Sequence, residues 1–170
     1  MPLDIKIPSH ICNLAMLFKH QPTRMIQPGY KMFRGCWLAQ NTFPGGNWFA
    51  PTLDGAAQYV AFHAKSGREK NYTPYIFEGS VNHALDFVDL NQSHIDAFSL
   101  AYSGIWSHEQ IIKDIPLAFA SLSKTNWAGF FCTPSQEYFV CNPTSNLTQQ
   151  KTWANQQALA EASRVKGFNV

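Results

Sequence analysis

The sequence lacks several features that would place it in a common functional class. No apolar run reaches about 18 residues, so a membrane-spanning helix is not expected. No basic segment followed by an apolar stretch, the pattern of an ordinary secretory signal, stands near its start. Only 14% of the residues are charged, and a net charge of +2 is too small for electrostatic binding of nucleic acid.

Metal-binding and redox motifs are missing as well. The four cysteines form no CxxC pair, and the six histidines do not have the spacing of metal ligands. We therefore expect no metal site, and free thiols by default, although Cys132 and Cys141 lie on neighbouring strand patterns and could approach each other. A nucleophilic Cys36 assisted by His63 or His83 is an alternative to the interpretation of Cys36 as an incidental thiol.

Hydrophobic and aromatic residues are abundant instead. Of the 170 residues, 45% are hydrophobic and 14% are aromatic. A chain of this length usually forms one domain and buries roughly 70% of its unfolded surface. We expect a single domain over residues 1–170, with its core over about residues 30–147 and a helix flanking the core at each end.

The periodicity of the apolar residues predicts short strands interrupted by helices. Ser9 and Thr52 are positioned as N-caps of two helices, and Gly45 and Gly46 mark a turn between these helices. Because strands and helices do not alternate regularly, the pattern favours an α+β fold. The expected helices cover residues 9–20, 53–62, 93–102, 107–112 and 148–166, and the main expected strands cover residues 30–35, 74–81, 84–90, 130–132 and 137–141.

Three short segments contain residues that could carry chemistry. In Phe33-Arg34-Gly35, the guanidinium at a strand end can bind a carboxylate or phosphate, and the glycine lets a ligand approach the backbone. The second segment covers residues 45–62 and leads from the glycine turn into the helix. The third covers residues 135–143 and places Glu137 at the start of a strand, directly after a short loop.

In their order and spacing, these segments resemble the arginine–serine–glutamate signature of the ADP-ribosyltransferase superfamily, whose members consume NAD. The resemblance covers roughly residues 30–147 and is strongest within the three segments. It implies an ADP-ribosyltransferase-like split antiparallel β-sheet sandwich with flanking helices, which holds NAD in a central cleft.

The resemblance also implies a role for each matching residue. Glu137 is expected to stabilise the positive charge that develops on the ribose as the nicotinamide–ribose bond breaks. Arg34, the second expected catalytic residue, would bind the phosphates of NAD and order the site, and the backbone of Gly35 would bond the nicotinamide amide. The other expected ligand contacts are Phe49, Thr52 and Tyr59, which would bind NAD as the cofactor, and Phe131 and Gln136, which would bind substrate.

The sequence departs from the family pattern in two places. The Ser-Thr-Ser of the family is replaced by Ala50-Pro51-Thr52, so only Thr52 can supply a hydroxyl. Members that modify arginine carry Gln or Glu two residues before the catalytic glutamate, where this sequence has Ser135. The acceptor of ADP-ribose is therefore left open between another side chain, a small molecule, a nucleic acid and water.

The expected function is that of an NAD-dependent mono-ADP-ribosyltransferase with a protein acceptor, of the kind found among effectors and toxins. Such a protein would be cytoplasmic or exported without a cleaved signal peptide. The alternatives are an NAD glycohydrolase or phosphorylase of the same fold, and a non-enzymatic binding module. Glu78, which also lies on a predicted strand, is the alternative to Glu137 as the essential carboxylate. The sequence leaves the oligomeric state open.

Overall fold

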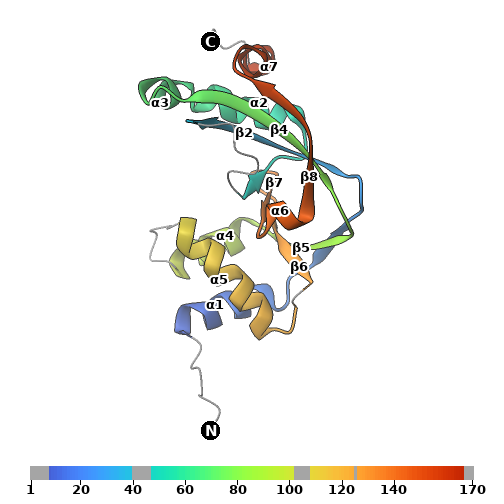
Figure 1. Cartoon of the computed structure of the whole chain (residues 1–170). Helices are drawn as coiled ribbons and strands as arrows, with labels where there is room; N and C mark the ends of the chain where they lie inside the picture. The colour runs from blue at the N-terminus through green and yellow to red at the C-terminus, as the bar shows by residue number, and fades with distance from the viewer. Residues whose placement is uncertain (1–7, 40–46, 102–107, 125, 167–170) are drawn as a thin grey trace.

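The computed structural model describes residues 8–39, 47–101, 108–124 and 126–166. Within these ranges the chain folds into one five-stranded and one three-stranded sheet, each with helices beside it (Figure 1). This arrangement confirms the α+β class predicted from the sequence. The expected turn at Gly45 and Gly46 lies outside the described residues. None of the described helices is both long and apolar enough to cross a membrane.

The five-stranded sheet has the strand order β1-β5-β6-β7-β3. Its strands are β1 (Thr23–Ile26), β3 (Trp48–Phe49), β5 (Leu85–Leu90), β6 (Trp127–Cys132) and β7 (Glu137–Val140). The expectation of an antiparallel sandwich is wrong for one pair, because β5 and β6 run parallel. A parallel pair needs a long crossover, which here contains α4 (Gln92–Ala101) and α5 (His108–Ser121).

The three-stranded sheet is antiparallel, with the order β2-β4-β8. It consists of β2 (Lys31–Leu38), β4 (Thr73–Val81) and β8 (Leu147–Ala154). The helix expected over residues 148–166 is therefore wrong in its first half, because that half is the edge strand β8. Residues 148–151 of β8 are exposed and polar, so the strand contains few of the apolar residues that would mark it as a strand. The chain turns at Asn155, whose φ is 49°, before α7 (Gln156–Lys166) begins.

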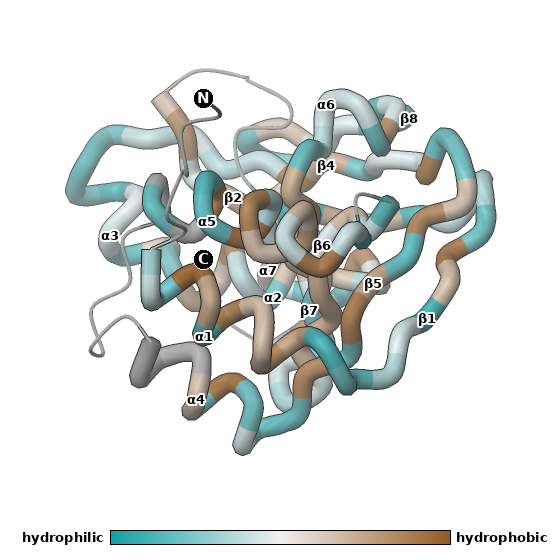
Figure 2. The backbone as a smooth tube through the Cα atoms, turned by 90° about the horizontal axis from the view of Figure 1, so that it is seen from below, coloured by the Kyte–Doolittle hydropathy of each residue, from teal (hydrophilic) through white to brown (hydrophobic). Residues whose placement is uncertain are grey.

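The helices form two groups, one beside each sheet (Figure 1). Helix α1 (Ser9–Phe18) joins α4 and α5 beside the five-stranded sheet, and α2 (Leu53–Phe62), α3 (Ala64–Glu69) and α7 lie beside the other sheet. Figure 2 shows hydrophobic stretches along β5 and β6, which lie at the centre of their sheet. The short α6 (Pro143–Asn146) leads into β8.

The two predicted N-caps have different outcomes. Thr52 caps α2 as expected, because its Oγ1 accepts a hydrogen bond from the backbone N–H of Gly55 at 3.1 Å. Ser9 does not cap α1: it is the first helical residue, and Pro8 occupies the cap position without a side-chain hydrogen bond.

Within the described residues, one isolated backbone bridge joins the two sheets beside α2. Phe33 on β2 donates its N–H to the carbonyl of Ala50 at 2.8 Å, and the N–H of Ala50 returns a bond to the carbonyl of Phe33 at 2.6 Å. Ala50 directly follows β3, the edge strand of the five-stranded sheet. The bridge therefore brings Arg34, the next residue on β2, close to the segment that enters α2.

Candidate functional site

A cleft of about 560 Å³ lies between the start of α2 and the loop before β7. The segment after β3, helix α2 and the loop all contribute to its walls. Its lining residues are Ala50, Pro51, Thr52, Asp54, Gly55, Gln58, Tyr59, Phe62, His63, Ser135, Gln136 and Glu137. Four of the residues expected at the site (Thr52, Tyr59, Gln136 and Glu137) thus line the same cleft. The volume is typical of a small-molecule site.

Glu137 is the first residue of β7 and lies opposite Cys132 on β6. The loop before it contains Gln136, whose φ is 55° and whose Nε2 donates to the carbonyl of Thr133 at 2.6 Å. The carboxyl of Glu137 is half-buried, and this loss of solvent raises its pKa above the usual value. A hydrogen bond from the Ser135 hydroxyl opposes the shift by stabilising the carboxylate.

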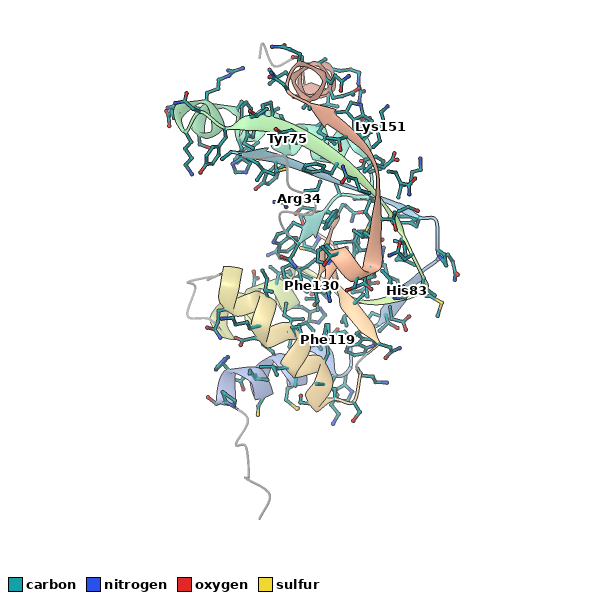
Figure 3. All side chains as sticks on the ribbon, in the orientation of Figure 1. Arg34, Tyr75, His83, Phe119, Phe130 and Lys151 are labelled. Carbon is teal, nitrogen blue, oxygen red and sulfur yellow. The ribbon has the colours of Figure 1, made fainter. Side chains whose placement is uncertain are left out.

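Arg34 lines a second, smaller cavity of about 190 Å³, between β2 and the ends of α2 and α3. Figure 3 shows Arg34 on the side of β2 that faces the five-stranded sheet. Its Nη1 donates to the carbonyl of Trp48 at 3.4 Å, and its buried Nε has no hydrogen-bond partner among the described residues. Lys70 also lines this cavity, and no carboxylate does so among the described residues. A cavity with two cations and a buried unpartnered N–H is suited to an anion.

Tyr59 and His63 connect the two cavities, because both residues line each of them. They lie one turn apart on α2, and their ring centroids are 4.2 Å apart. Partial burial raises the pKa of the Tyr59 hydroxyl; the charge of Arg34 opposes this shift, and the charge of Glu137 adds to it. Arg34, Tyr59 and Glu137, which come from β2, α2 and β7, are therefore neighbours in space.

Gly35 lies beneath α2 and lines neither cavity. A Cβ at this position would meet the carbonyl oxygen of Ala56 at 2.0 Å, so only glycine allows this close approach of helix and strand. Backbone groups alternate in direction along an antiparallel strand, so the N–H and C=O of Gly35 point, like those of Phe33, away from β4. Phe33 uses these groups to bond Ala50, whereas no described residue bonds those of Gly35.

Two of the aromatic residues expected to contact ligands are buried in the core. Phe49 is 1% exposed and lies opposite Tyr138 on the neighbouring strand. Phe131 is 3% exposed, and the guanidinium of Arg24 covers its ring at 3.9 Å. Neither residue lines the cleft, so the structure corrects both assignments to core packing: an apolar ring on a central or paired strand is more favourably buried than exposed.

The sequence interpretation missed His63, Phe62 and Gln58 as lining residues. Phe62 is 80% exposed and His63 follows Tyr59 by four positions, the spacing that puts two side chains on one face of a helix. Helical spacing from Tyr59 could therefore have identified His63. Phe62 and Gln58 precede His63 and Tyr59 by one residue each. They line the cleft together with the loop before β7, a contact between segments that are distant in the sequence.

Of the alternative chemical groups, Glu78, Cys36 and His83 do not line the larger cleft, whereas Cys36 lines the smaller cavity and His63 lines both. Glu78 is 8% exposed on β4 and pairs with Lys31, whose Nζ lies 3.4 Å from its Oε1. Burial raises the pKa of the Cys36 thiol to about 11, which disfavours a nucleophilic thiolate. Cys132 and Cys141 are free thiols, and the described residues contain no cluster of side chains that could hold a metal ion.

Comparison of the chain with protein-family models, with curated proteins and with solved structures finds no match.

Proposed function

We propose that the chain is an NAD-dependent mono-ADP-ribosyltransferase and that NAD occupies the cleft and the adjoining cavity. One observation supports this proposal above the others: Arg34 and Glu137, from two separate segments of the sequence signature, line two cavities that share Tyr59 and His63, and the charges of both act on Tyr59. A structural role alone does not require these two charges to be neighbours, because they come from different sheets and do not pair with each other.

The two cavities differ in charge in a way that suits two adjacent parts of NAD, the nicotinamide riboside and the diphosphate. The larger cleft contains the carboxyls of Glu137 and Asp54, and it would receive the nicotinamide and its ribose. The smaller cavity contains Arg34 and Lys70, and it would receive the phosphates. Tyr59 is 43% exposed between them and offers a ring face to the nicotinamide.

The chemistry proposed for Glu137 is electrostatic. The nicotinamide–ribose bond breaks with its electron pair leaving on nicotinamide, so positive charge develops on the ribose. A carboxylate near the ribose stabilises that charge, and its half-buried position strengthens the interaction relative to water. The acceptor then forms a bond to the ribose carbon and gives up a proton.

A second candidate, the NAD glycohydrolase, is favoured by Ser135. This residue occupies the position at which arginine-modifying enzymes carry Gln or Glu, and its hydroxyl bonds Glu137 itself. An acceptor arginine would find no amide or carboxylate at that position, whereas water needs none. The two reactions differ in their product: a transferase labels a protein, and a glycohydrolase releases free ADP-ribose.

The test is incubation of NAD with the purified protein, with nicotinamide measured by chromatography. The Glu137→Gln variant should lose about 100-fold or more of the rate, because the neutral amide does not stabilise the developing cation. Glu69→Gln, which changes an exposed carboxyl on α3 outside both cavities, should keep the full rate. Full activity of Glu137→Gln would refute the assignment, and NAD labelled in the adenosine half separates protein transfer from hydrolysis.

A further inference from the structure

A third cavity, of about 480 Å³, lies at the opposite end of β7 from Glu137. It is formed by the turn between β4 and β5, the beginning of β6, the residues after β7, and α6. Its lining residues are His83, Ala84, Leu85, Pro116, Asn126, Trp127, Ala128, Cys141, Asn142, Ser145 and Asn146. It shares no lining residue with the cleft, and Figure 3 shows His83 in a different part of the molecule from Arg34.

The lining of this cavity is polar but carries no carboxylate, lysine or arginine among the described residues. Its polar side chains are the amides of Asn126, Asn142 and Asn146, the hydroxyl of Ser145 and the imidazole of His83. Asp86 bonds Asn126 and Lys124 Nζ lies 5.8 Å from the centroid of the Trp127 ring, but neither side chain lines the cavity itself, so the lining offers no ion-pair partner to a phosphate or a metal ion. Uncharged donors and acceptors instead match the hydroxyl groups of a neutral ligand.

Two of the amides, those of Asn126 and Asn142, form a hydrogen bond with a neighbouring side chain. Asn126 donates from Nδ2 to Oδ2 of Asp86 at 3.0 Å, so its Oδ1 is left to accept a bond. Asn142 accepts at Oδ1 from the hydroxyl of Thr144 at 3.2 Å, so its Nδ2 is left to donate. Each of these two exposed amides thus keeps a group for a ligand, an acceptor on Asn126 and a donor on Asn142, and a ligand hydroxyl can use either.

Trp127 adds an aromatic surface to this set of amides. Its ring is half-buried and is held by an edge-on contact with Phe119, with centroids 5.2 Å apart and an interplanar angle of 87°. An aromatic ring beside these amides suits a compound that has both an apolar C–H face and several hydroxyls. We propose that this cavity binds a neutral sugar unit, independently of the NAD site.

The test uses the full chain, labelled with nitrogen-15 and titrated with the methyl glycosides of glucose, galactose, mannose and N-acetylglucosamine. At least one should cause saturable shifts of the Trp127 indole N–H and of the Asn126 and Asn142 amides. Asn142→Ala and Asn126→Ala should each weaken binding about three- to tenfold, the effect of one neutral hydrogen bond. Gln150→Ala, which removes an exposed amide from β8 outside the cavity, should leave binding unchanged.

Three results would overturn the proposal. One is the absence of saturable shifts at these residues with all four glycosides at their highest soluble concentrations. Another is a saturable shift at the cavity with adenosine but with none of the sugars, which would assign it to a nucleobase. The third is equal weakening by Gln150→Ala and the two cavity variants. The spectra also report whether each variant is folded, and the second asparagine variant keeps the test decisive if one does not fold.

Discussion

Phe33 and Ala50 exchange two backbone hydrogen bonds, of 2.8 and 2.6 Å, and these bonds join the three-stranded sheet to the five-stranded sheet. Arg34 follows Phe33 directly, and Thr52, the N-cap of α2, lies two residues after Ala50. The bridge thus joins the segment that enters α2 to β2, one residue before Arg34. The position of Tyr59 between the two cavities depends on this junction and on the close contact between α2 and β2.

Replacement of Gly35 by alanine should disturb that contact. The new Cβ would meet the carbonyl oxygen of Ala56 at 2.0 Å, so α2 must move away from β2. We expect a loss of about 3 kcal/mol in the free energy of unfolding, measured in urea, and weaker NAD binding because Tyr59 moves with the helix. Gly29→Ala is the control: a Cβ there meets nothing within 4 Å, so only its φ of 87° costs stability, about 1 kcal/mol. Equal losses would contradict the proposed packing.

Removal of the Tyr59 ring should weaken NAD binding without a large loss of stability. Tyr59 is 43% exposed, so Tyr59→Ala removes little core packing. We expect NAD to bind about tenfold more weakly by calorimetry, since a ring contact is worth up to about 1.5 kcal/mol. Phe62→Ala removes a neighbouring ring that is 80% exposed and lines only the larger cleft, and should have a smaller effect. If Phe62→Ala weakened binding more, nicotinamide stacking on Tyr59 would be wrong.

Lys70 should contribute to binding of the phosphates. Lys70→Gln removes one of the two full cations of the smaller cavity, so ADP should bind about fivefold more weakly, and the dependence of binding on salt should decrease. Arg68→Gln removes a cation outside the cavity, from helix α3, which ends one residue before Lys70, and serves as the control. The same loss in both variants would indicate a general effect of net charge rather than a site at Lys70.

Ser135 should set the lower pH limit of NAD cleavage. The Ser135 hydroxyl stabilises the ionised form of Glu137, so Ser135→Ala should raise the pKa of this carboxyl further. Because the reaction requires the carboxylate, the acid side of the pH–rate profile should move to higher pH. Ser121→Ala, which changes a hydroxyl bonded to the carbonyl of Ala118 on α5, should leave the profile in place. A shift to lower pH would be the opposite of the expected sign.

The parts of the fold that depend on local signals could be predicted from the sequence. Helix α2 was identified by its apolar spacing and by the cap at Thr52, both of which act within one or two turns. Strand β8 was missed because it is an edge strand of polar residues, and its pairing partner β4 is distant in the sequence. The parallel pairing of β5 and β6 is likewise a long-range contact, for which the sequence contains no local signal.

The candidate site was predicted in part for the same reason. Arg34 lies within β2, and Glu137 is the first residue of β7, directly after a short loop. The strand pattern around each residue could therefore be identified from the sequence. The burial of Phe49 depends on its pairing with β7, whereas Tyr59 is 43% exposed and lines a cleft together with the loop before Glu137. Two aromatic residues of the same sequence segment, Phe49 and Tyr59, therefore differ in burial, and the sequence contains no local signal for that difference.

The most direct test of the proposed NAD site is a crystal structure of the Glu137→Gln variant with NAD, because this variant should bind NAD without cleaving it. We predict that the nicotinamide ribose lies within hydrogen-bond distance of residue 137 and that a phosphate contacts Arg34, with Tyr59 between them. The site would be refuted if NAD at saturating concentration were absent from both cavities, or if it contacted neither Arg34 nor residue 137.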